Sequence, residues 1–320
     1  MPLISIVMPV YGVEKYIAES VKTICNQTFK DFELILVDDG TKDRSIEYAE
    51  VELSKYDIDH TVIHQSNQGV SAARNIGIKK SSGEWVICID PDDGIDANTL
   101  SVLSQLIKRN PSINVWGINF RMVNSLKSDS LEEQYKFDIF KREELIELFL
   151  LRKIKIITPG LLIKKQLVVE SNLFYDSDVK FTEDLLYIWK ILSFISEFGF
   201  VHNSFYQYLE RPESTMTSSS IDKIKTGYNA FKKLDNQIKE KLVNYGKWGE
   251  FIFPRWLLGT FKSSARHMSY KEFQKLTEEF DYKNNIKLLK KIPDWRTKFV
   301  AQLILYSRIT FYYLAKNRVF

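Results

Sequence analysis

Cysteine is scarce in this chain of 320 residues, which contains only Cys25 and Cys88. Each thiol stands inside an apolar run, and a single pair is too few for a disulfide framework or a cysteine metal site. The sequence therefore predicts a protein of a reducing compartment. No basic leader followed by a long apolar stretch precedes the strand-like run Leu3 to Val10, so we expect no signal peptide and a cytoplasmic location.

Long hydrophobic runs are also missing. The most apolar stretch near the C-terminus, residues 295–320, is broken by Arg308 and falls short of the roughly twenty uninterrupted residues that cross a bilayer. Its mixture of aromatic and basic side chains is typical of a helix lying in a membrane interface. The alternative is that this apolar surface packs against the catalytic part of the chain or against a second subunit, as in a homo-oligomer.

Patterns typical of several other enzyme classes are absent. No Gly-x-Gly-x-x-Gly follows a strand-like run, which argues against a dehydrogenase. After the first strand, Pro9 to Lys15 offers only Gly12 and Lys15 to bind a triphosphate, which disfavours a nucleotidyltransferase that makes sugar nucleotides. No convincing Ser/His/Asp or Cys/His arrangement supplies a covalent nucleophile. A non-catalytic module that binds nucleotide sugars or membranes would be expected to lack the acidic residues described below.

Charge is distributed unevenly along the chain. Residues 221–320 hold 21 Lys and Arg against 9 Asp and Glu, whereas residues 1–220 hold 24 against 32. This asymmetry indicates chemistry in the first part and contact with an anionic surface in the second, although a solvated, lysine-rich helical face would explain it equally well. The basic residues form no recognisable nucleic-acid-binding motif, so we expect no nucleic-acid partner.

The first 120 residues alternate short β-branched runs with helical periodicity, which is typical of an α/β protein built around a mainly parallel sheet. Strands are expected over residues 4–9, 33–37, 61–64, 85–90, 115–120, 154–162 and 197–208, and helices near 142–151 and over 182–195. Arg121 to Lys136 is expected to be a loop. We expect a catalytic domain over 1–218, with nucleotide binding in about 1–120 and the acceptor side in about 121–218, and a helical region over 219–320.

Acidic residues follow two of the expected strands directly. Asp38 and Asp39 come after one strand, and Asp90, Asp92 and Asp93 come after another. Ligands bind at the carboxyl ends of strands in open α/β sheets, and neighbouring parallel strands bring those ends together. Three crowded carboxylates repel one another, and a divalent cation is the simplest remedy. An all-oxygen donor set favours Mg or Mn over Zn, with a diphosphate completing the shell.

Each of these motifs also has a purely structural interpretation. The Asp90 to Asp93 segment can be an acidic turn that caps a helix, and Asp38-Asp39-Gly40 reads equally well as a turn. The small residues before Arg74 suit a helix start near an anion or simply close packing. Glu183 and Asp184 open an amphipathic helix, where acidic residues favour the helix dipole, but a carboxylate there can also serve as a general base.

Taken together, the motifs resemble the family 2 glycosyltransferases of the GT-A fold over roughly residues 3–215. The segments that carry the resemblance are Ser5 to Tyr11, Asn26-Gln27-Thr28, Leu36 to Gly40, Asn67 to Gly77, Asp90-Pro91-Asp92-Asp93 and Glu183-Asp184. The resemblance implies a Rossmann-like, mixed and mainly parallel sheet flanked by helices. The C-terminal helical region follows this domain.

The resemblance also implies roles for matching positions. Donor contacts are expected from Pro9, Val10, Tyr11, Asp39 (on the base), Arg74, Asp90 and Asp92. The metal is assigned to Asp92 and Asp93; family members differ in whether the first and third or the adjacent carboxylates serve, so we rank Asp92 first. Asp184 is the expected base. His202, before the expected closing loop, is either structural or a contact to donor or metal.

The implied activity is inverting transfer of a sugar from a nucleotide diphosphate donor, UDP by resemblance, to a hydroxyl of a glycan or lipid-linked acceptor in capsule-type polysaccharide synthesis. A direct displacement assisted by Mn or Mg needs no covalent intermediate. Two positions depart from the family pattern: Gly12 replaces a common Asn, and Ile252 stands where processive synthases have the Gln of Gln-x-x-Arg-Trp. We therefore expect a non-processive enzyme, attached peripherally to the inner membrane face if its C-terminal region binds lipid.

Overall fold

The computed structural model describes residues 1–129, 134–211, 221–240 and 248–320. Two compact units emerge, which are described separately. Unit 1 comprises residues 1–142, 155–177 and 183–212, and unit 2 comprises residues 143–154, 178–182 and 213–320. The expected domain boundary at residue 218 lies outside the described residues.

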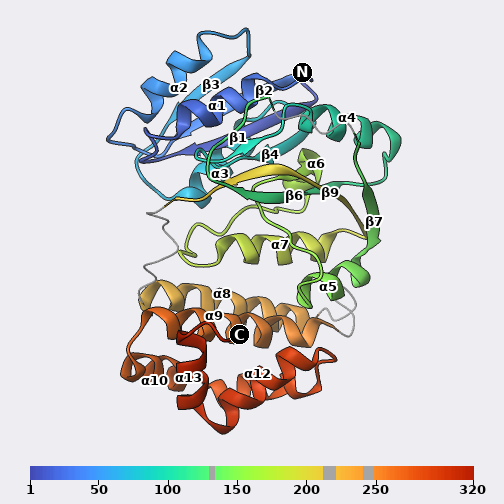
Figure 1. Ribbon diagram of the computed structural model, residues 1–320. Coiled ribbons are helices and arrows are strands. Elements are labelled where there is room, and N and C mark those ends of the chain that lie inside the picture. The colour runs from blue at the N-terminus through green and yellow to red at the C-terminus, as the bar shows by residue number, and fades with distance from the viewer. Residues whose placement is uncertain (130–133, 212–220, 241–247) are drawn as a thin grey trace. The chain divides into compact units, whose positions relative to one another are not determined.

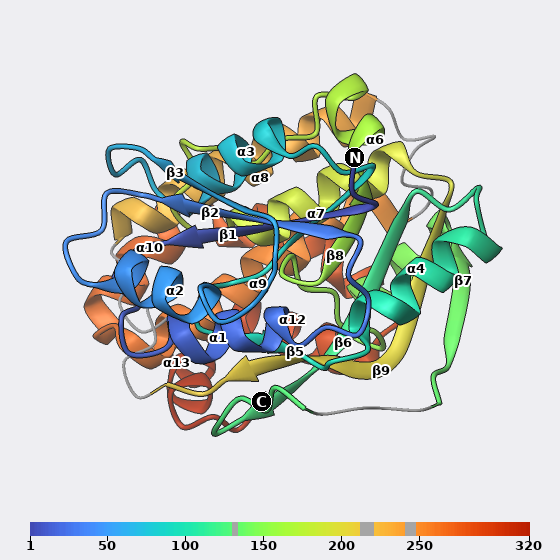
Figure 2. The ribbon, with the colours of Figure 1, turned by 90° about the horizontal axis from the view of Figure 1, so that it is seen from above.

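Unit 1 contains the sheet, whose strands among the described residues are β1 (Ile4–Val10), β2 (Phe32–Asp38), β3 (His60–His64), β4 (Trp85–Cys88), β5 (Gly94–Ile95), β6 (Val115–Val123), β7 (Phe137–Lys141), β8 (Leu161–Lys164) and β9 (Glu197–Leu209). They are ordered β3-β2-β1-β4-β8-β6-β9-β5, with β7 also paired to β9. Only β8, β5 and β7 among these run against the remaining strands, as their antiparallel pairings show. The sheet is therefore mixed and mainly parallel, as predicted (Figure 2).

Helices cover both faces of the parallel part of this sheet. They are α1 (Ile17–Cys25), α2 (Ser45–Leu53), α3 (Val70–Lys80), α4 (Thr99–Arg109), α6 (Lys165–Glu170) and α7 (Glu183–Phe194). In Figure 2, α1 and α2 lie on one side of β1 and β2, and α3 lies on the other. Every residue of β1 is buried, because its side chains alternate between these two covered faces.

A close approach between α3 and the sheet depends on Gly77. A Cβ added to Gly77 would lie 2.2 Å from Val7 Cγ1 and 3.2 Å from Val37 Cγ2. The backbone of α3 at Gly77 therefore packs directly against the side chains of Val7 and Val37, with no room for a side chain on the helix at this position. This contact fixes α3 so that its first turns, which carry Arg74, lie at the carboxyl ends of the strands.

The structure corrects the expected elements in several places. Residues 154–160 are not a strand, because the strand begins only at Leu161 after Gly160, whose φ of +94° is unsuited to a strand. β6 extends through Val123 into the expected loop. The short or edge elements β5, β7 and α6 and the helix α4 were not predicted. A two-residue strand and a half-exposed edge strand carry too little hydrophobic periodicity to be recognised.

Unit 2 is mainly helical, and the described residues of the C-terminal region, 219–320, are mostly in helices as predicted. Its elements are α5 (Arg142–Leu150, whose first residue belongs to unit 1), α8 (Ile221–Glu240), α9 (Gly249–His267), α10 (Tyr270–Glu279), α11 (Tyr282–Ile286), the 3-10 helix η4 (Lys287–Lys291), α12 (Trp295–Tyr306) and α13 (Arg308–Lys316). Aromatic contacts join them: the rings of Phe231 of α8 and Trp256 of α9 stack with centroids 4.5 Å apart, and the rings of Phe261 of α9 and Phe273 of α10 meet edge to face at 6.2 Å. In Figure 1, α8 and α9 run side by side.

The C-terminal stretch that suggested one interfacial helix is two helices. Ser307 ends α12, and its side chain accepts a hydrogen bond from the backbone of Thr310 to begin α13. Val300, Ile304 and Phe311 are buried within the unit. Within the described ranges, no helix has both the length and the apolar character needed to span a membrane.

Candidate functional site

The two acidic segments lie on either side of the end of β1. Because β1 pairs in parallel with both β2 and β4, the residues that follow β2 and β4 meet at one edge of the sheet. The chain crosses from β1 to β2 on one side and reaches β4 on the other, and crevices at such points bind ligands in open α/β sheets. Tyr11, which follows β1 at this edge, is 52% exposed, whereas Val10 is fully buried.

Asp39 fixes the loop that leads into α3. It is 3% exposed, and its Oδ1 accepts hydrogen bonds from Gln65 Nε2 (2.6 Å) and the Gln68 backbone N–H (2.8 Å). Its Oδ2 accepts a third from the Gly69 N–H at 2.8 Å, where Gly69 has a φ of +93°. Asp39 therefore positions the start of α3, and its expected contact with the nucleotide base stays a prediction.

Arg74 joins two of the predicted site carboxylates. Its guanidinium is almost completely buried, with Nη2 2.7 Å from Asp90 Oδ1 and Nη1 2.6 Å from Asp184 Oδ1. Burial opposes the charge, but Asp184 and Asp90 outweigh it and raise the pKa of Arg74 well above its usual value. The residue is thus a permanent cation beneath the site. Its expected proximity to the donor stays a prediction, whereas its hold on the two carboxylates is observed.

Asp92 forms an ion pair with a second arginine, Arg211. Its Oδ2 lies 2.5 Å from Nη2 of Arg211, and the Arg211 guanidinium also lies over the ring of Tyr16 at 5.2 Å. Burial first, and the charge of Asp90 second, raise the pKa of Asp92 above its usual range, although Arg211 opposes the shift. Asp92 is a carboxylate that a bound cation would stabilise.

Asp93 faces β9 and uses both oxygens there. Tyr206 Oη donates to Oδ2 at 2.8 Å, and the Leu209 backbone N–H donates to Oδ1 at 2.9 Å. Burial, followed by the charges of Asp90 and Asp92, raises the pKa of Asp93 to about 8. Tyr206 also accepts a bond from the Asp90 N–H at 3.3 Å, and it was missed from sequence because a tyrosine in a strand gives no distinguishing signal.

The carboxylate oxygens at this edge of the sheet are suitable ligands for a hard divalent cation that binds few protein groups. Nowhere in residues 1–129, 134–211, 221–240 and 248–320 do three acidic, histidine or cysteine side chains form a ready-made metal cage. Mg and Mn sites with nucleotide substrates need only one or two carboxylates, because phosphate oxygens and waters fill the rest of the shell. Asp90 and Asp92 each pair one oxygen with an arginine, Arg74 and Arg211, and each has a second oxygen outside these pairs, so their role as metal ligands stays a prediction. A role for Asp93 as the second ligand stays a prediction, since its oxygens are engaged with β9.

Asp184 lies in the first turn of α7, with 44% of its side chain exposed. One oxygen is held by Arg74, so the carboxylate has a fixed orientation and an accessible face. Its neighbour Glu183 is more enclosed: burial, and then the charge of Asp184, raise the pKa of Glu183 above its usual range. Asp184 is therefore oriented by Arg74 and accessible from the other side, and its role as the base stays a prediction.

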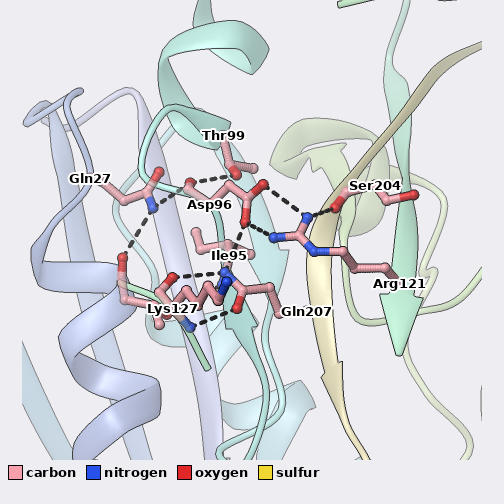
Figure 3. A network of polar contacts seen from close by, with 9 residues as sticks. Gln27, Ile95, Asp96, Thr99, Arg121, Lys127, Ser204 and Gln207 are labelled. Carbon is pink, nitrogen blue, oxygen red and sulfur yellow. Dashed lines mark hydrogen bonds and ion pairs between the residues drawn. The ribbon is translucent and has the colours of Figure 1, made fainter. Parts of the chain in front are cut away.

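A second polar network lies further along β6 and β9 (Figure 3). Asp96 Oδ1 accepts from Arg121 Nη2 (2.6 Å) and Gln207 Nε2 (2.8 Å), while the Asp96 carbonyl accepts from Gln27 Nε2 at 2.8 Å. The predicted Asn26-Gln27-Thr28 motif is thus structural at its centre, since Gln27 is fully buried. Part of this network lines a cavity of about 990 Å³ together with His202.

Within the described part of the chain, His202 forms no hydrogen bond or ion pair with the segment Asp90 to Asp93. Its Nε2 lies 2.7 Å from Asp138 Oδ2 on β7. The structural interpretation of this histidine is therefore favoured. The closing loop was expected over Tyr206 to Ser214, but its first residues, Tyr206 to Leu209, belong to β9. The rest is described only as far as Arg211, and Pro212 to Ser214 lie outside the described residues.

Comparison with known proteins agrees with this geometry. Residues 5–166 match the family model described as glycosyl transferase family 2. The chain is 30% identical over 253 residues to the uncharacterized glycosyltransferase EpsJ of Bacillus subtilis, covering 78% of this chain and 71% of EpsJ. It is 30% identical over 229 residues to the cholesterol galactosyltransferase of Borreliella burgdorferi, covering 68% of this chain and 63% of that protein.

A third relative, TarS, is similar to this chain both in sequence and in its solved structure. The poly(ribitol-phosphate) beta-N-acetylglucosaminyltransferase TarS of Staphylococcus aureus is 25% identical over 223 residues, covering 68% of this chain and 37% of TarS. The crystal structure of a TarS fragment in complex with UDP-GlcNAc matches the fold with a TM-score of 0.70 at 19% identity, over 100% of this chain and 91% of that chain. This likeness confirms the expected GT-A fold. The chain therefore belongs to glycosyl transferase family 2 and is a glycosyltransferase.

Proposed function

We propose that the chain transfers a sugar from a UDP-sugar to a hydroxyl of a glycan or lipid-linked acceptor, with inversion at the anomeric carbon, in the synthesis of a capsule-like cell-surface polysaccharide. The observation that carries the proposal is the buried Arg74, which binds Asp90 on the donor side and Asp184 on the opposite helix. One cation thus sets the spacing between a metal-binding segment and a candidate base. TarS is named for transfer of N-acetylglucosamine to poly(ribitol-phosphate), a phosphate-containing polymer, and this relative supports a polymeric acceptor for this chain.

The donor would bind at the edge formed by the ends of β1, β2 and β4. A divalent cation, Mn or Mg, held by Asp92 with Asp90, or with Asp93 as the alternative, would neutralise charge on the departing diphosphate. Tyr11, exposed at the end of β1, and the loop anchored by Asp39 would border the nucleotide. UDP is supported by the TarS complex with UDP-GlcNAc, although that protein's sugar need not be this chain's.

Asp184 would accept the proton of the acceptor hydroxyl as the hydroxyl attacks. Arg74 holds Oδ1, which leaves the other oxygen of a partly exposed carboxylate to receive that proton. Attack from the face opposite the diphosphate inverts the centre in one displacement. No enzyme nucleophile takes part in this scheme.

Peripheral contact with the inner membrane face, or with a second copy of the chain, is proposed for unit 2. The supporting feature is a group of exposed aromatic side chains on α12: Trp295 (70% exposed), Phe299 (55%) and Tyr306 (80%). Co-sedimentation of the chain with anionic vesicles tests the membrane arm, and sedimentation equilibrium tests the oligomer. Substituting Trp295, Phe299 and Tyr306 by Ser should abolish whichever association is observed, and an unchanged association would refute a role for this surface.

A screen for donor hydrolysis tests the activity. The chain is incubated with each common nucleotide sugar, with Mn, with Mg or with neither in metal-free buffer, and free nucleotide is measured. We expect slow, metal-stimulated release from UDP-sugars, strongly reduced in Asp92→Asn. Release of pyrophosphate from a nucleoside triphosphate and a sugar phosphate, without any donor hydrolysis, would instead establish the nucleotidyltransferase alternative.

A further inference from the structure

A cluster of four cationic side chains lies within unit 2, remote in sequence from every residue assigned above. Three come from α9, namely Arg255, Lys262 and Arg266, and the fourth is Arg152 after α5. The α9 residues follow helical spacing, so they share one face of the helix with Gly259 between them. Arg152 reaches this face, because its Nη2 lies 3.7 Å from the position that a Cβ on Gly259 would occupy.

The backbone at Arg152 is unusual. Its φ is +59°, in the left-handed region where a helix end usually has glycine or asparagine. The turn is closed by hydrogen bonds from the Arg152 N–H to the Phe149 carbonyl (3.0 Å) and from the Lys153 N–H to the Leu148 carbonyl (2.8 Å). A residue with a Cβ therefore adopts a conformation that favours glycine, and its guanidinium meets α9 from this position.

The cluster has little compensating charge. Within the described residues, no carboxylate lies at ion-pair distance from Arg152, Arg255, Lys262 or Arg266. Asp294 acts on Arg255 only from further away, and its carboxylate accepts a hydrogen bond at 2.8 Å from the backbone of Thr297 at the start of α12. Arg255 Nε is shielded from solvent and has no hydrogen-bond partner among the residues that the structure describes.

Burial and the neighbouring positive charges lower the pKa of Lys262. Burial, and then the charges of Arg152, Arg255 and Arg266, lower the pKa of Lys262 to about 8. Burial first and Arg152 second lower the pKa of Arg255 to about 10. The ammonium of Lys262 lies 5.2 Å from the ring centre of Phe320, whose chain end lies beside α9 in Figure 1. Within the described residues these like charges meet no acidic partner, and a face of this kind is complementary to an anion.

We infer that Arg152, Arg255, Lys262 and Arg266 form a binding site for a phosphate or diphosphate group. Guanidinium forks match the oxygens of phosphate, and a multiply charged tetrahedral anion can accept bonds from several cations at once. A carboxylate has only two oxygens and one charge with which to satisfy four donors. Assigning this ligand as the phosphate-bearing part of the acceptor rests on the proposed function, whereas the site itself does not.

Residue-specific lysine labelling tests the site. The whole chain is acetylated briefly at pH 8 with an amine-reactive reagent, with and without pyrophosphate or inorganic phosphate, and each lysine is quantified by mass spectrometry. We expect Lys262 to be labelled quickly and to be protected at least fivefold by pyrophosphate, while the exposed Lys271 of α10 is unaffected. Because the readout is specific to Lys262, pyrophosphate bound at the donor edge does not contribute.

Variants and a second ligand source complete the test. Arg255→Gln should weaken the protecting effect of pyrophosphate by roughly tenfold, since a hydrogen bond to a charged group is lost, whereas Lys271→Gln should not change it. Vesicles with phosphatidic acid, compared with phosphatidylcholine alone, show whether a lipid phosphate can be the source. Equal protection by sodium chloride at matched ionic strength, or protection by neither phosphate source, would overturn the site. Loss of donor hydrolysis with protection intact would refute only the proposed function.

Discussion

Arg74 Nη1 lies 2.6 Å from Asp184 Oδ1, although 110 residues separate the two in the chain. The same guanidinium binds Asp90 through Nη2 at 2.7 Å. Because Arg74 is buried, these two bonds connect α3 both to the residues after β4 and to the first turn of α7. Arg74 therefore links the segment proposed to bind the metal to the proposed base.

Replacing Arg74 tests the connection. Arg74→Met should destabilise unit 1 by ~2 kcal/mol, since charge-assisted hydrogen bonds to two carboxylates are lost, and should abolish transfer. The exposed Arg44, which pairs with Glu47 on the surface, provides the control. Arg44→Met should leave the stability nearly unchanged, because an exposed ion pair contributes little. Urea unfolding measures both, and equal effects of the two substitutions would remove the special role of Arg74.

Asp184 is tested against its neighbour. Asp184→Asn should lower kcat for transfer by on the order of 10²–10⁴, because the proton acceptor is lost, and should leave donor affinity nearly unchanged. Glu183→Gln should retain most of the activity, since burial already favours the neutral form of Glu183. Steady-state kinetics with an identified acceptor decides, and the reverse pattern would assign the base to Glu183.

The adjacent carboxylates of the metal segment should behave differently. Asp92→Asn should weaken Mn binding by at least roughly tenfold, measured by calorimetry in the presence of UDP. Asp93→Asn should instead lower stability by about 1–3 kcal/mol, because the amide cannot accept from both Tyr206 and Leu209. A stable Asp93→Asn chain that no longer binds Mn would make Asp93 the second ligand.

The contact at Gly77 predicts a compensating pair of substitutions. Gly77→Ala places a Cβ 2.2 Å from Val7 Cγ1 and should destabilise the chain by about 1–3 kcal/mol. Val7→Ala removes the clashing methyl groups, so the double variant should be more stable than the sum of the single effects predicts. Strict additivity in a double-mutant cycle would contradict the close approach of α3 to β1.

Lys262 should give the protein a pH-dependent stability. A folded pKa of about 8, below the ordinary lysine value of 10.5, means that the folded state binds fewer protons than the unfolded state between these values. Stability therefore rises with pH across that window. Lys262→Gln should raise the melting temperature more at pH 7 than at pH 10, where the wild-type repulsion has disappeared. An equal change at both pH values would show that Arg152, Arg255 and Arg266 do not act on Lys262.

Sequence reasoning located the parallel half of the sheet and the acidic strand ends, because buried strands such as β1 give continuous apolar runs. It also placed Asp184 at the start of a helix. It did not foresee that Asp93 would turn toward Tyr206, or that Arg211 would pair with Asp92, because these contacts join segments more than one hundred residues apart. No local pattern records such partners.

The helical C-terminal part shows the same limit. Lysine and arginine content suggested either contact with an anionic surface or a solvated helical face, but not that Arg152, from a separate segment, would meet the α9 face at Gly259. Helical periodicity likewise could not show that Ser307 divides the last helical stretch, since a serine is compatible with either a helix interior or a cap.

The central claim is that carboxylates at the strand ends bind a cation which in turn binds the diphosphate of the donor. Calorimetric titration of UDP-GlcNAc and other UDP-sugars into the wild-type chain and Asp92→Asn, with Mn and in metal-free buffer, tests it most directly. The account predicts Mn-enhanced binding of at least one UDP-sugar in the wild type and loss of that enhancement in Asp92→Asn. Binding that is equally tight without metal, or unchanged in the variant, would contradict it.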